Sequence, residues 1–410
     1  MTDPIREFFL DDPRKLDDPF EDLAWLREHS PVHWHEPVKQ WFVFPYDDVK
    51  ALFADSRLSA NRMTGFVEAA PEPVRDELRA LVPYLEKWLV FRDGVDHARV
   101  RSVLHRGFNT RAIKALRAPI ERAAIDLIDG RAHSGQLDVA GDYGFLLPAY
   151  VLSDFMGVPK ADRDRIVKWS IDFVDFFNVI PITEDTTRRL VASATEMSAY
   201  TRDLLAERRT AERADFLGVM ATAMRHGEIT EDEIVGNTLL LLIAGHVAVR
   251  NLVGNVIWLL LEHPDEHQRL QAEPRLLRSV IEESLRMEPP VTLIPRIAAQ
   301  DVLVGGRDIS AGEIIQLSIA AANRDPSRFP QPNRFDAARD PRGLSFGHGP
   351  HGCLGARLAM EQSSIALDVL FRRLGHRFRL DEDRPIRWYR NAGNRGPEEL
   401  SITFSAPRTR

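Results

Sequence analysis

The spacing of hydrophobic and polar residues predicts a mostly helical chain. Apolar residues recur at helical spacing over residues 95–106 and 110–132. The longest predicted helix covers residues 230–262 and begins with a capping-box pattern, in which Thr230 is followed three residues later by Glu233. The middle of this helix is apolar nearly all round, so we expect it to cross the interior of the protein.

Strand-like segments are short and lie near the two ends of the chain. Residues 33–46 predict two strands around a polar turn. Short strands with glycine turns are predicted up to about residue 321, and further strands are predicted over the tail, residues 378–404. Strands and helices do not alternate along the chain, so parallel α/β layering is not supported. The pattern favours a mainly α fold with small β-sheets.

Irregular segments separate these elements. Residues 60–92 contain several prolines and predict a long connection with one helix, about residues 73–81. Connections of this length are often functional. A glycine-rich loop at residues 347–355 follows the predicted helix 274–287 and leads into another helix. Without a repeat or a low-complexity linker, we expect one compact domain over residues 1–410.

Composition narrows the function classes. The chain carries 54 Lys and Arg against 61 Asp and Glu, a net charge of −7, so no basic excess points to nucleic acid as a partner. A single cysteine excludes an internal disulfide and a four-cysteine metal site. The amino terminus lacks an apolar signal core, and the longest apolar run is far below the about 20 residues of a membrane span. We therefore expect a cytoplasmic protein without a membrane partner.

The lone cysteine lies in the sequence FGHGPHGCLG, residues 346–355, which allows several interpretations. A single cysteine is most often a small buried hydrophobe. The glycines also match the dinucleotide pattern G-x-G-x-x-G, although no strand is predicted before them. A zinc site is a further alternative, with His348, His351 and Cys353 as ligands, but a fourth ligand is not evident.

One interpretation accounts for the whole segment. Four glycines let the backbone approach a flat ligand closely and direct N–H groups at the Cys353 sulfur. The helix that begins just after Cys353 turns its positive end toward that sulfur, which favours the thiolate. Phe346 can shield the sulfur from water. Such a thiolate suits the axial ligand of haem iron.

The segment F-G-x-G-x-H-x-C-x-G resembles the haem-ligand loop of the cytochrome P450 family of haem-thiolate monooxygenases, in its soluble bacterial form. Other segments resemble family motifs in the family's order. Residues 283–286 resemble its E-x-x-R motif, residues 322–335 the meander that partners it, residues 97–101 its H-x-x-x-R motif, and residues 239–254 its central helix. The resemblance extends over nearly the whole chain.

The resemblance implies the cytochrome P450 fold as a single haem-enclosing unit, with haem b (iron-protoporphyrin IX) as cofactor and dioxygen as co-substrate. Cys353 is the implied iron ligand and first catalytic residue. Glu283 and Arg286 are implied to form a buried structural pair with Arg334 or Arg339. The other implied haem contacts are His97, Arg101, Ala244, Arg296, Phe346, Gly347, His351 and Gly355.

The central helix departs from the family pattern. Most relatives carry an acid followed by threonine after Ala-Gly-x, where the alcohol organises the water that delivers protons during dioxygen activation. Here Val247 and Ala248 occupy those two positions, and neither side chain can relay a proton. A substrate hydroxyl, ordered water, direct use of peroxide, or radical coupling without oxygen insertion could each take the place of the relay. His246 is a further catalytic candidate, although a structural role suits it better.

The resemblance also implies an apolar pocket and therefore a hydrophobic small-molecule substrate, oxidised in a tailoring step of secondary metabolism such as antibiotic biosynthesis. Arg75, Arg250 and Arg395 are candidates for binding a carboxylate or a carrier-bound acyl chain. The implied pocket residues are Met63, Phe66, Trp88, Phe173, Phe176, Phe177, Leu239, Ile243, Val247, Leu293 and Ile294.

No flavin or nicotinamide domain is fused to the chain, so the resemblance implies a ferredoxin and a ferredoxin reductase as electron donors. Arg99, Arg106, Arg342 and Arg357 could form a cationic docking patch for the ferredoxin. We expect a monomer. Two alternatives of other classes remain open: a peroxide-driven peroxygenase and a haem-binding protein without turnover.

Overall fold

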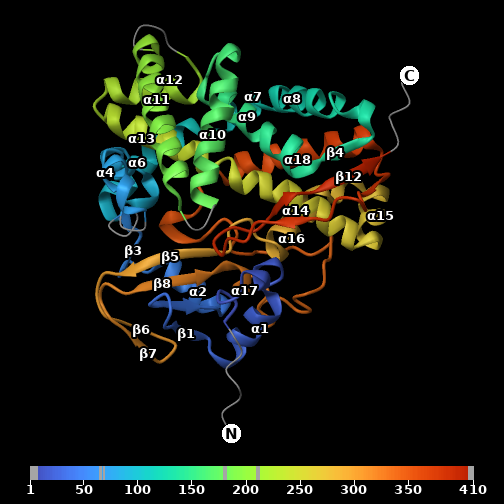
Figure 1. Cartoon of the computed structure of the whole chain (residues 1–410), viewed down its shortest axis with the longest axis horizontal. Helices are drawn as coiled ribbons and strands as arrows, with labels where there is room; N and C mark the ends of the chain where they lie inside the picture. The colour runs from blue at the N-terminus through green and yellow to red at the C-terminus, as the bar shows by residue number, and fades with distance from the viewer. Residues whose placement is uncertain (1–7, 64–66, 68–69, 179–181, 209–212, 405–410) are drawn as a thin grey trace. The chain divides into compact units, whose positions relative to one another are not determined.

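The computed structural model describes residues 8–63, 67, 70–178, 182–208 and 213–404 (Figure 1). Over these residues helices dominate and the sheets are small, which confirms the mainly α fold. Contacts divide the chain into two compact units, and each unit is built from discontinuous segments. The first unit combines residues 1–59, 254–352 and 385–400, and the second combines residues 60–253, 353–384 and 401–410.

The first unit contains a five-stranded sheet, in which the predicted N-terminal hairpin joins strands that come much later in the chain (Figure 1). The hairpin strands pair antiparallel, β2 pairs parallel with β8, and β8 pairs antiparallel with β5. In sheet order the strands are β1 (Val32–His35), β2 (Gln40–Val43), β8 (Ile314–Ser318), β5 (Leu293–Ala298) and β3 (Leu58–Ser59).

Two smaller hairpins complete the strands of this unit. Gly305 and Gly306 adopt positive φ angles of 53° and 77° in the turn of one hairpin, as the glycine pair in the sequence predicts. The strands are β6 (Val302–Val304) with β7 (Arg307–Ile309), and β10 (Arg387–Trp388) with β11 (Pro397–Glu399). Its helices are η1 (Pro13–Asp17), α1 (Phe20–His29), α2 (Tyr46–Ala54), α15 (Pro264–Ala272), η7 (Pro274–Leu276), α16 (Leu277–Met287), α17 (Ile319–Ala322) and η8 (Gly349–His351).

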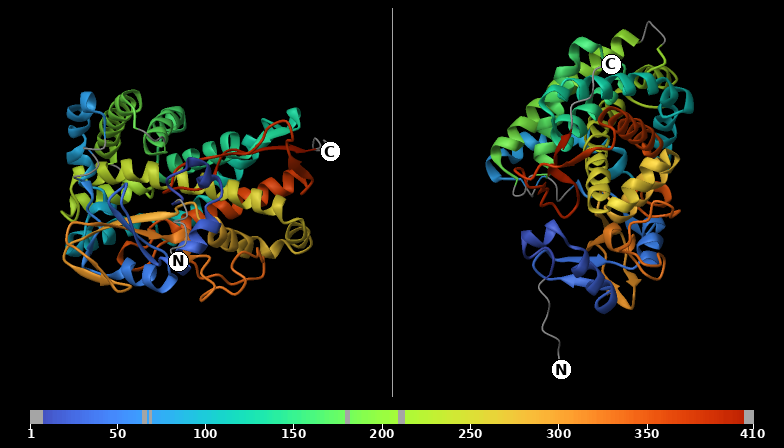
Figure 2. Two further views of the ribbon diagram at one scale, coloured as in Figure 1. Left: turned by 60° about the horizontal axis from the view of Figure 1, so that its bottom comes forward. Right: turned by 90° about the vertical axis from the view of Figure 1, so that its right-hand side faces the viewer.

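The second unit is a helical layer with one three-stranded sheet. In this unit α8 packs along α18, and both views of Figure 2 show the two helices side by side. The sheet order is β4 (Gln136–Asp138), β12 (Ser401–Phe404) and β9 (Phe378–Leu380). The helices are η2 (Glu72–Val74), α4 (Arg75–Arg79), α5 (Val82–Leu85), η3 (Leu89–Phe91), α6 (Gly94–Gly107), α7 (Thr110–Ala115), α8 (Arg117–Asp129), η4 (Ala132–Ser134), η5 (Val139–Phe145), α9 (Leu146–Met156), η6 (Lys160–Asp162), α10 (Arg163–Asn178), α11 (Glu184–Arg208), α12 (Phe216–Arg225), α13 (Glu231–Ala244) and α18 (Ala356–Leu374).

The long central helix is interrupted, and this corrects the prediction of one helix over residues 230–262. The capping box at Thr230 is present, but α13 ends at Ala244 and α14 (Val247–Glu262) starts after a turn at Gly245 and His246. Gly245 is a poor helix former, and the N–H of His246 bonds to the carbonyl three residues back, at 3.3 Å, instead of four. The boundary between the two units falls inside α14.

Two other predicted helices also differ in extent. The helix predicted over residues 110–132 divides into α7 and α8 around Leu116. Pro119 lacks the N–H that would bond to the Ala115 carbonyl, so the helix breaks there. The helix predicted over residues 73–81 is a 3₁₀ turn followed by the short α4.

The segment Glu231–Glu262 is long and apolar enough to cross a membrane, and 67% of its most apolar stretch is buried inside the protein. A buried core helix has the same composition. The burial agrees with the prediction that this segment crosses an interior.

Candidate active site

Cys353 lies in the second unit, immediately before α18, whose first residue is Ala356. Its side chain is exposed to solvent, and the protein atoms packed around it still desolvate the sulfur in part. This desolvation raises the pKa of the thiol, while the N–H groups of Gly355 and Ala356 and the guanidinium of Arg101 act in the opposite direction. The predicted donors to a thiolate are therefore present around an accessible sulfur.

The glycine loop before Cys353 belongs to the first unit and packs closely on α2. Gly347 and Gly349 adopt positive φ angles of 70° and 69°. A Cβ atom at Gly349 would lie 3.1 Å from Ala54, so only glycine fits there. Phe346 is half-buried beside this loop.

The loop geometry corrects two of the alternatives. No strand precedes the loop, so the dinucleotide-binding interpretation fails. Within the described part of the chain, no group of three His, Cys, Asp or Glu side chains could hold a metal ion, so the zinc interpretation fails as well. The exposed cysteine is also not a buried core residue.

The predicted propionate contacts lie in both units. In the second unit, α6 carries His97, which is buried, and Arg101, which is half-buried. In the first unit, Arg296 is buried in β5 with its guanidinium 5.8 Å from the Phe53 ring, and His351 is half-buried in η8. Burial lowers the pKa of Arg101, and the neighbouring Cys353 acts against this effect.

The interrupted central helix carries no acid–alcohol pair. Ala244 at the end of α13 is exposed, Ala248 is half-buried and Val247 is buried. His246 is fully buried, with its ring 4.2 Å from that of Phe145. Burial and the charge of Arg250 lower the pKa of His246 to about 3, so it stays neutral near pH 7. An enclosed, neutral histidine cannot collect protons from solvent, and the geometry favours the structural role.

Several of the predicted pocket residues lie close together in the second unit. The Trp88 and Phe177 rings lie 6.1 Å apart and the Phe176 and Phe177 rings 5.1 Å apart, in the second unit. Phe66 lies outside the described residues. Met63, Phe173, Leu239 and Val247 are also buried in the second unit, Ile243 is half-buried there, and Leu293 and Ile294 lie in β5 of the first unit.

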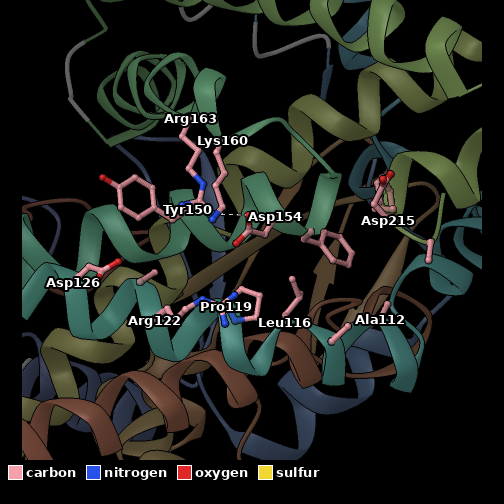
Figure 3. A pocket seen from close by; sticks show the side chains of 15 residues that line it. Ala112, Leu116, Pro119, Arg122, Asp126, Tyr150, Asp154, Lys160, Arg163 and Asp215 are labelled. Carbon is pink, nitrogen blue, oxygen red and sulfur yellow. Dashed lines mark hydrogen bonds and ion pairs between the residues drawn. The ribbon is translucent and has the colours of Figure 1, made fainter.

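A cavity of about 490 Å³ opens elsewhere in the second unit, between α7, α8 and α9 (Figure 3). Leu116, Pro119 and Phe155 line its apolar wall, and the Arg163–Asp154 ion pair lies at its polar side. None of the predicted pocket residues lines it. This cavity is therefore not the predicted substrate pocket.

Comparison with known proteins decides the family. The family model "Cytochrome P450" matches residues 164–393, more than half of the chain. Cyclomarin C epoxidase CymV of Salinispora arenicola is 34% identical over 386 residues, which covers 93% of this chain and 95% of that protein. The chain belongs to the cytochrome P450 family. Its members use haem and dioxygen and are monooxygenases.

Solved cytochrome P450 structures share the fold over nearly the whole chain. The crystal structure of CalO2 superposes with a TM-score of 0.88, at 30% identity and 96% and 98% coverage of the two chains. The structure of P450BioI in complex with an acyl carrier protein bearing hexadec-9Z-enoic acid superposes with a TM-score of 0.86, at 28% identity and 96% and 100% coverage.

The Glu283–Arg286 pair of this cytochrome P450 is fully buried in α16 of the first unit. Arg286 donates from Nε and one Nη to the two Glu283 oxygens, both at 2.8 Å. Arg339 Nε donates to Glu283 at 2.9 Å. Of the two predicted meander partners, the side chain of Arg339 makes the ion pair, whereas Arg334 contributes its carbonyl oxygen, 3.3 Å from Arg286.

The three arginines predicted as candidates for binding a carboxylate each make contacts within the protein. Arg75 Nε donates to the Ala70 carbonyl at 3.0 Å. Arg250 is buried and donates to the Ala140 carbonyl at 3.2 Å. Arg395 is buried in an ion pair with Glu288.

The four arginines of the predicted docking patch differ in their partners. Arg99 pairs with Glu233 at 2.5 Å and with Asp96 at 2.7 Å. Arg106 pairs with Glu228. Arg357 donates to the Thr110 hydroxyl at 2.5 Å, and Arg342 is exposed. Ion pairs with acids of this chain therefore neutralise two of the four arginines.

Sequence reasoning missed the charged cluster around Glu233. This capping-box glutamate is buried and also binds Arg92 at 2.9 Å, from a position 141 residues earlier, while Asp96 pairs with both Arg92 and Arg99. No local signal relates residues so far apart. Burial opposes ionisation of Glu233, but hydrogen bonds from Arg99 and the Thr230 N–H and the charge of Arg92 lower its pKa to about 2.

Proposed function

We propose that this cytochrome P450 holds haem through the Cys353 thiolate and oxidises a hydrophobic small molecule, by hydroxylation, epoxidation or oxidative coupling, in a tailoring step of secondary metabolism. The observation that carries the proposal is the accessible Cys353 sulfur, with two backbone N–H groups donating to it and the positive charge of Arg101 nearby. The natural-product epoxidase among its relatives supports the metabolic setting.

The residues present fit a bound haem. Bound haem supplies the iron centre at which dioxygen is activated. Cys353 would bind the iron, and Arg101 and His97, one helical turn apart on α6, would bind a propionate. On the family resemblance, Arg296 and His351 would bind a propionate as well, Phe346 and Gly347 would shield the sulfur, and Ala244 and Gly355 would lie against the porphyrin.

Proton delivery in this protein differs from the usual arrangement. The side chains of Val247 and Ala248 occupy the positions where most relatives carry polar groups, and neither can hold or relay a proton. We propose that ordered water or a hydroxyl of the substrate carries the protons. Replacing Ala248 by Thr should then change the partition of reducing equivalents between product and peroxide, and unchanged coupling would contradict this part of the proposal.

The protein needs a source of electrons, and its substrate is either free or bound to a carrier. The family generally works with redox partners, and we propose a ferredoxin and ferredoxin reductase, with a monomeric cytoplasmic enzyme as the acceptor. The complex of P450BioI with a loaded acyl carrier protein makes a carrier-bound substrate a second possibility. The absent acid–alcohol pair favours peroxide-driven turnover as the second candidate function.

The reduced carbon monoxide spectrum tests the thiolate directly. We expect the long-wavelength Soret band of a thiolate-ligated haem, and its loss with retained haem in Cys353→His. A spectrum typical of imidazole ligation in the unaltered protein would overturn the proposal. Turnover with ferredoxin and reductase, compared with turnover with peroxide alone, then separates the two candidate functions.

A further inference from the structure

The side chain of Asn237, on the second turn of α13, holds a distant segment of the second unit by its backbone. Its Oδ1 accepts a hydrogen bond from the Leu89 N–H at 2.9 Å, and its Nδ2 donates to the Lys87 carbonyl at 2.8 Å. Nδ2 also donates to the Glu233 carbonyl on its own helix at 2.8 Å, and Asn237 is buried. The amide therefore fixes the residues on both sides of Trp88.

Gly236, the preceding residue, lets this segment approach α13 closely. A Cβ atom at this position would lie 2.6 Å from the Tyr84 carbonyl oxygen and 2.9 Å from the Cβ of Lys87. No real side chain tolerates such contacts, so any larger residue must displace the backbone of residues 84–87. Gly236 and Asn237, which we call the α13 clamp, thus act on the same segment by close approach and by hydrogen bonding.

The α13 clamp holds Trp88 in an aromatic group. The indole of Trp88 is buried and stacks on Phe91, with ring centroids 5.6 Å apart and an interplanar angle of 10°. Its ring centroid also lies 6.1 Å from that of Phe177 of α10. Trp88, Phe176 and Phe177 are three of the residues proposed to line the substrate pocket.

We propose that Asn237 is a specificity-determining positioning residue, which keeps Trp88 closed over the pocket and so sets the size of the ligand that reaches the haem. This inference rests on the proposed function, because it takes Trp88 as a pocket residue. A bulky ligand must move Trp88, and movement of Trp88 must strain or break the hydrogen bonds of Asn237. A small ligand needs no such movement.

Two nitrogen ligands of different size measure this effect without knowledge of the substrate. Imidazole and 4-phenylimidazole both coordinate ferric haem iron and shift its Soret band, but only the second needs space beside the iron. In Asn237→Leu the hydrogen bonds to the Leu89 N–H and the Lys87 carbonyl are lost and no longer oppose the displacement of Trp88. We therefore expect 4-phenylimidazole to bind about tenfold more tightly. Imidazole should bind within about twofold of the unaltered protein.

Further variants guard against a general loss of structure. Gly236→Ala pushes the same backbone away while leaving the Asn237 amide in place, and should change the 4-phenylimidazole affinity in the same direction. Thr238→Val is the matched control, because Thr238 is buried on the same turn and its hydroxyl donates to the Ile234 carbonyl of its own helix, at 2.8 Å. In a Trp88→Ala background, Asn237→Leu should have no additional effect.

The two proposals fail in different ways. If imidazole produces no Soret shift in the unaltered protein, the haem-binding proposal falls and this inference falls with it. If imidazole binds normally but Asn237→Leu and Gly236→Ala change the affinities of both ligands equally, or change neither, the α13 clamp does not set ligand size and only this inference is overturned.

Discussion

Two buried charged clusters, one in each unit, use the same residue types in opposite ways. In the first unit, Glu283 and Arg286 are three residues apart on one helix and neither side chain is exposed to solvent. In the second unit, Glu233 joins α13 to Arg92 and Arg99, which come from another part of the chain, and the Arg99 side chain remains 44% exposed. The Glu283–Arg286 pair is local in sequence and fully buried, and Arg339 joins it from 56 residues away, whereas the second cluster is formed by distant residues and one of its arginines is exposed to solvent.

This difference in burial predicts different effects on stability when an acid of each cluster is removed. Removing one member of a fully buried ion pair costs much unfolding free energy, because water cannot solvate the charge that remains. The same substitution in a cluster that is partly exposed costs less unfolding free energy, because water can solvate the remaining charge. We therefore expect the first cluster to determine whether its unit folds, and the second to determine how α6, which carries His97 and Arg101, is held against α13.

The largest effect should come from Glu283→Gln. The substitution leaves the Arg286 guanidinium buried without its carboxylate, which costs about 3–5 kcal/mol of unfolding free energy. Urea unfolding of the holoprotein measures this loss. Glu282→Gln is the control, since Glu282 pairs with the exposed Arg278 on the same helix. Equal losses in both variants would contradict the contrast between buried and exposed pairs.

Glu233→Gln should have a smaller effect that depends on pH. The folded-state pKa of Glu233, about 2, is below its ordinary value of 4.5, so its ionisation stabilises the folded protein above pH 4.5. The full shift corresponds to about 3 kcal/mol, but water reaches the open side of the cluster and screens the charge, so we expect the variant to be less stable by about 2 kcal/mol at pH 7. The difference should shrink as the pH falls from 4.5 toward 2. A difference that does not change over this range would show that the carboxylate charge is not involved.

His246 gives the contrasting case of a buried base, whose ring nitrogens have no acid partner among the residues that the structure describes. Its folded-state pKa of about 3 is below its ordinary value of 6.5, so the unfolded chain binds a proton more readily than the folded one. The unaltered protein should therefore lose about 1 kcal/mol of stability, relative to His246→Phe, for each pH unit below 6.5. Parallel stability curves for the two proteins between pH 7 and pH 5 would contradict the burial of this ring.

The smallest effect should come from Glu228→Gln. Glu228 pairs with Arg106 near the other end of α6, and both side chains are partly exposed. We expect no measurable change in thermal unfolding temperature, because water screens the pair. If Glu228→Gln lost as much stability as Glu233→Gln, the exposed and the buried ion pairs of α6 would contribute equally, which would contradict this prediction.

Local chemistry made much of the fold predictable. The capping box at Thr230, the glycine turn at residues 305–306 and the glycine loop before Cys353 each depend on neighbours in sequence, and the structure shows all three. The resemblance to the family motifs identified the Glu283–Arg286 pair. These features share one property: the residues that cause them are only a few positions apart.

Other features depend on tertiary contacts that a single sequence does not reveal. Arg92, one of the partners of Glu233, lies 141 residues before it in the chain, and Asn237 donates to the carbonyl of Lys87, 150 residues before it. The apolar pattern gave no sign that Gly245 and His246 interrupt the central helix, because a short turn leaves that pattern unchanged. Arg99 and Arg106 were predicted as a docking surface because their acidic partners could not be identified from spacing.

The way the two units share the chain has a consequence for biosynthesis and engineering. Neither unit is a continuous stretch, so no continuous fragment contains one whole unit without part of the other. During synthesis the first unit stays incomplete until residues 385–400 have emerged from the ribosome. A chimera that exchanges one unit with that of a relative needs several junctions, and one of them falls on the peptide bond that precedes Cys353.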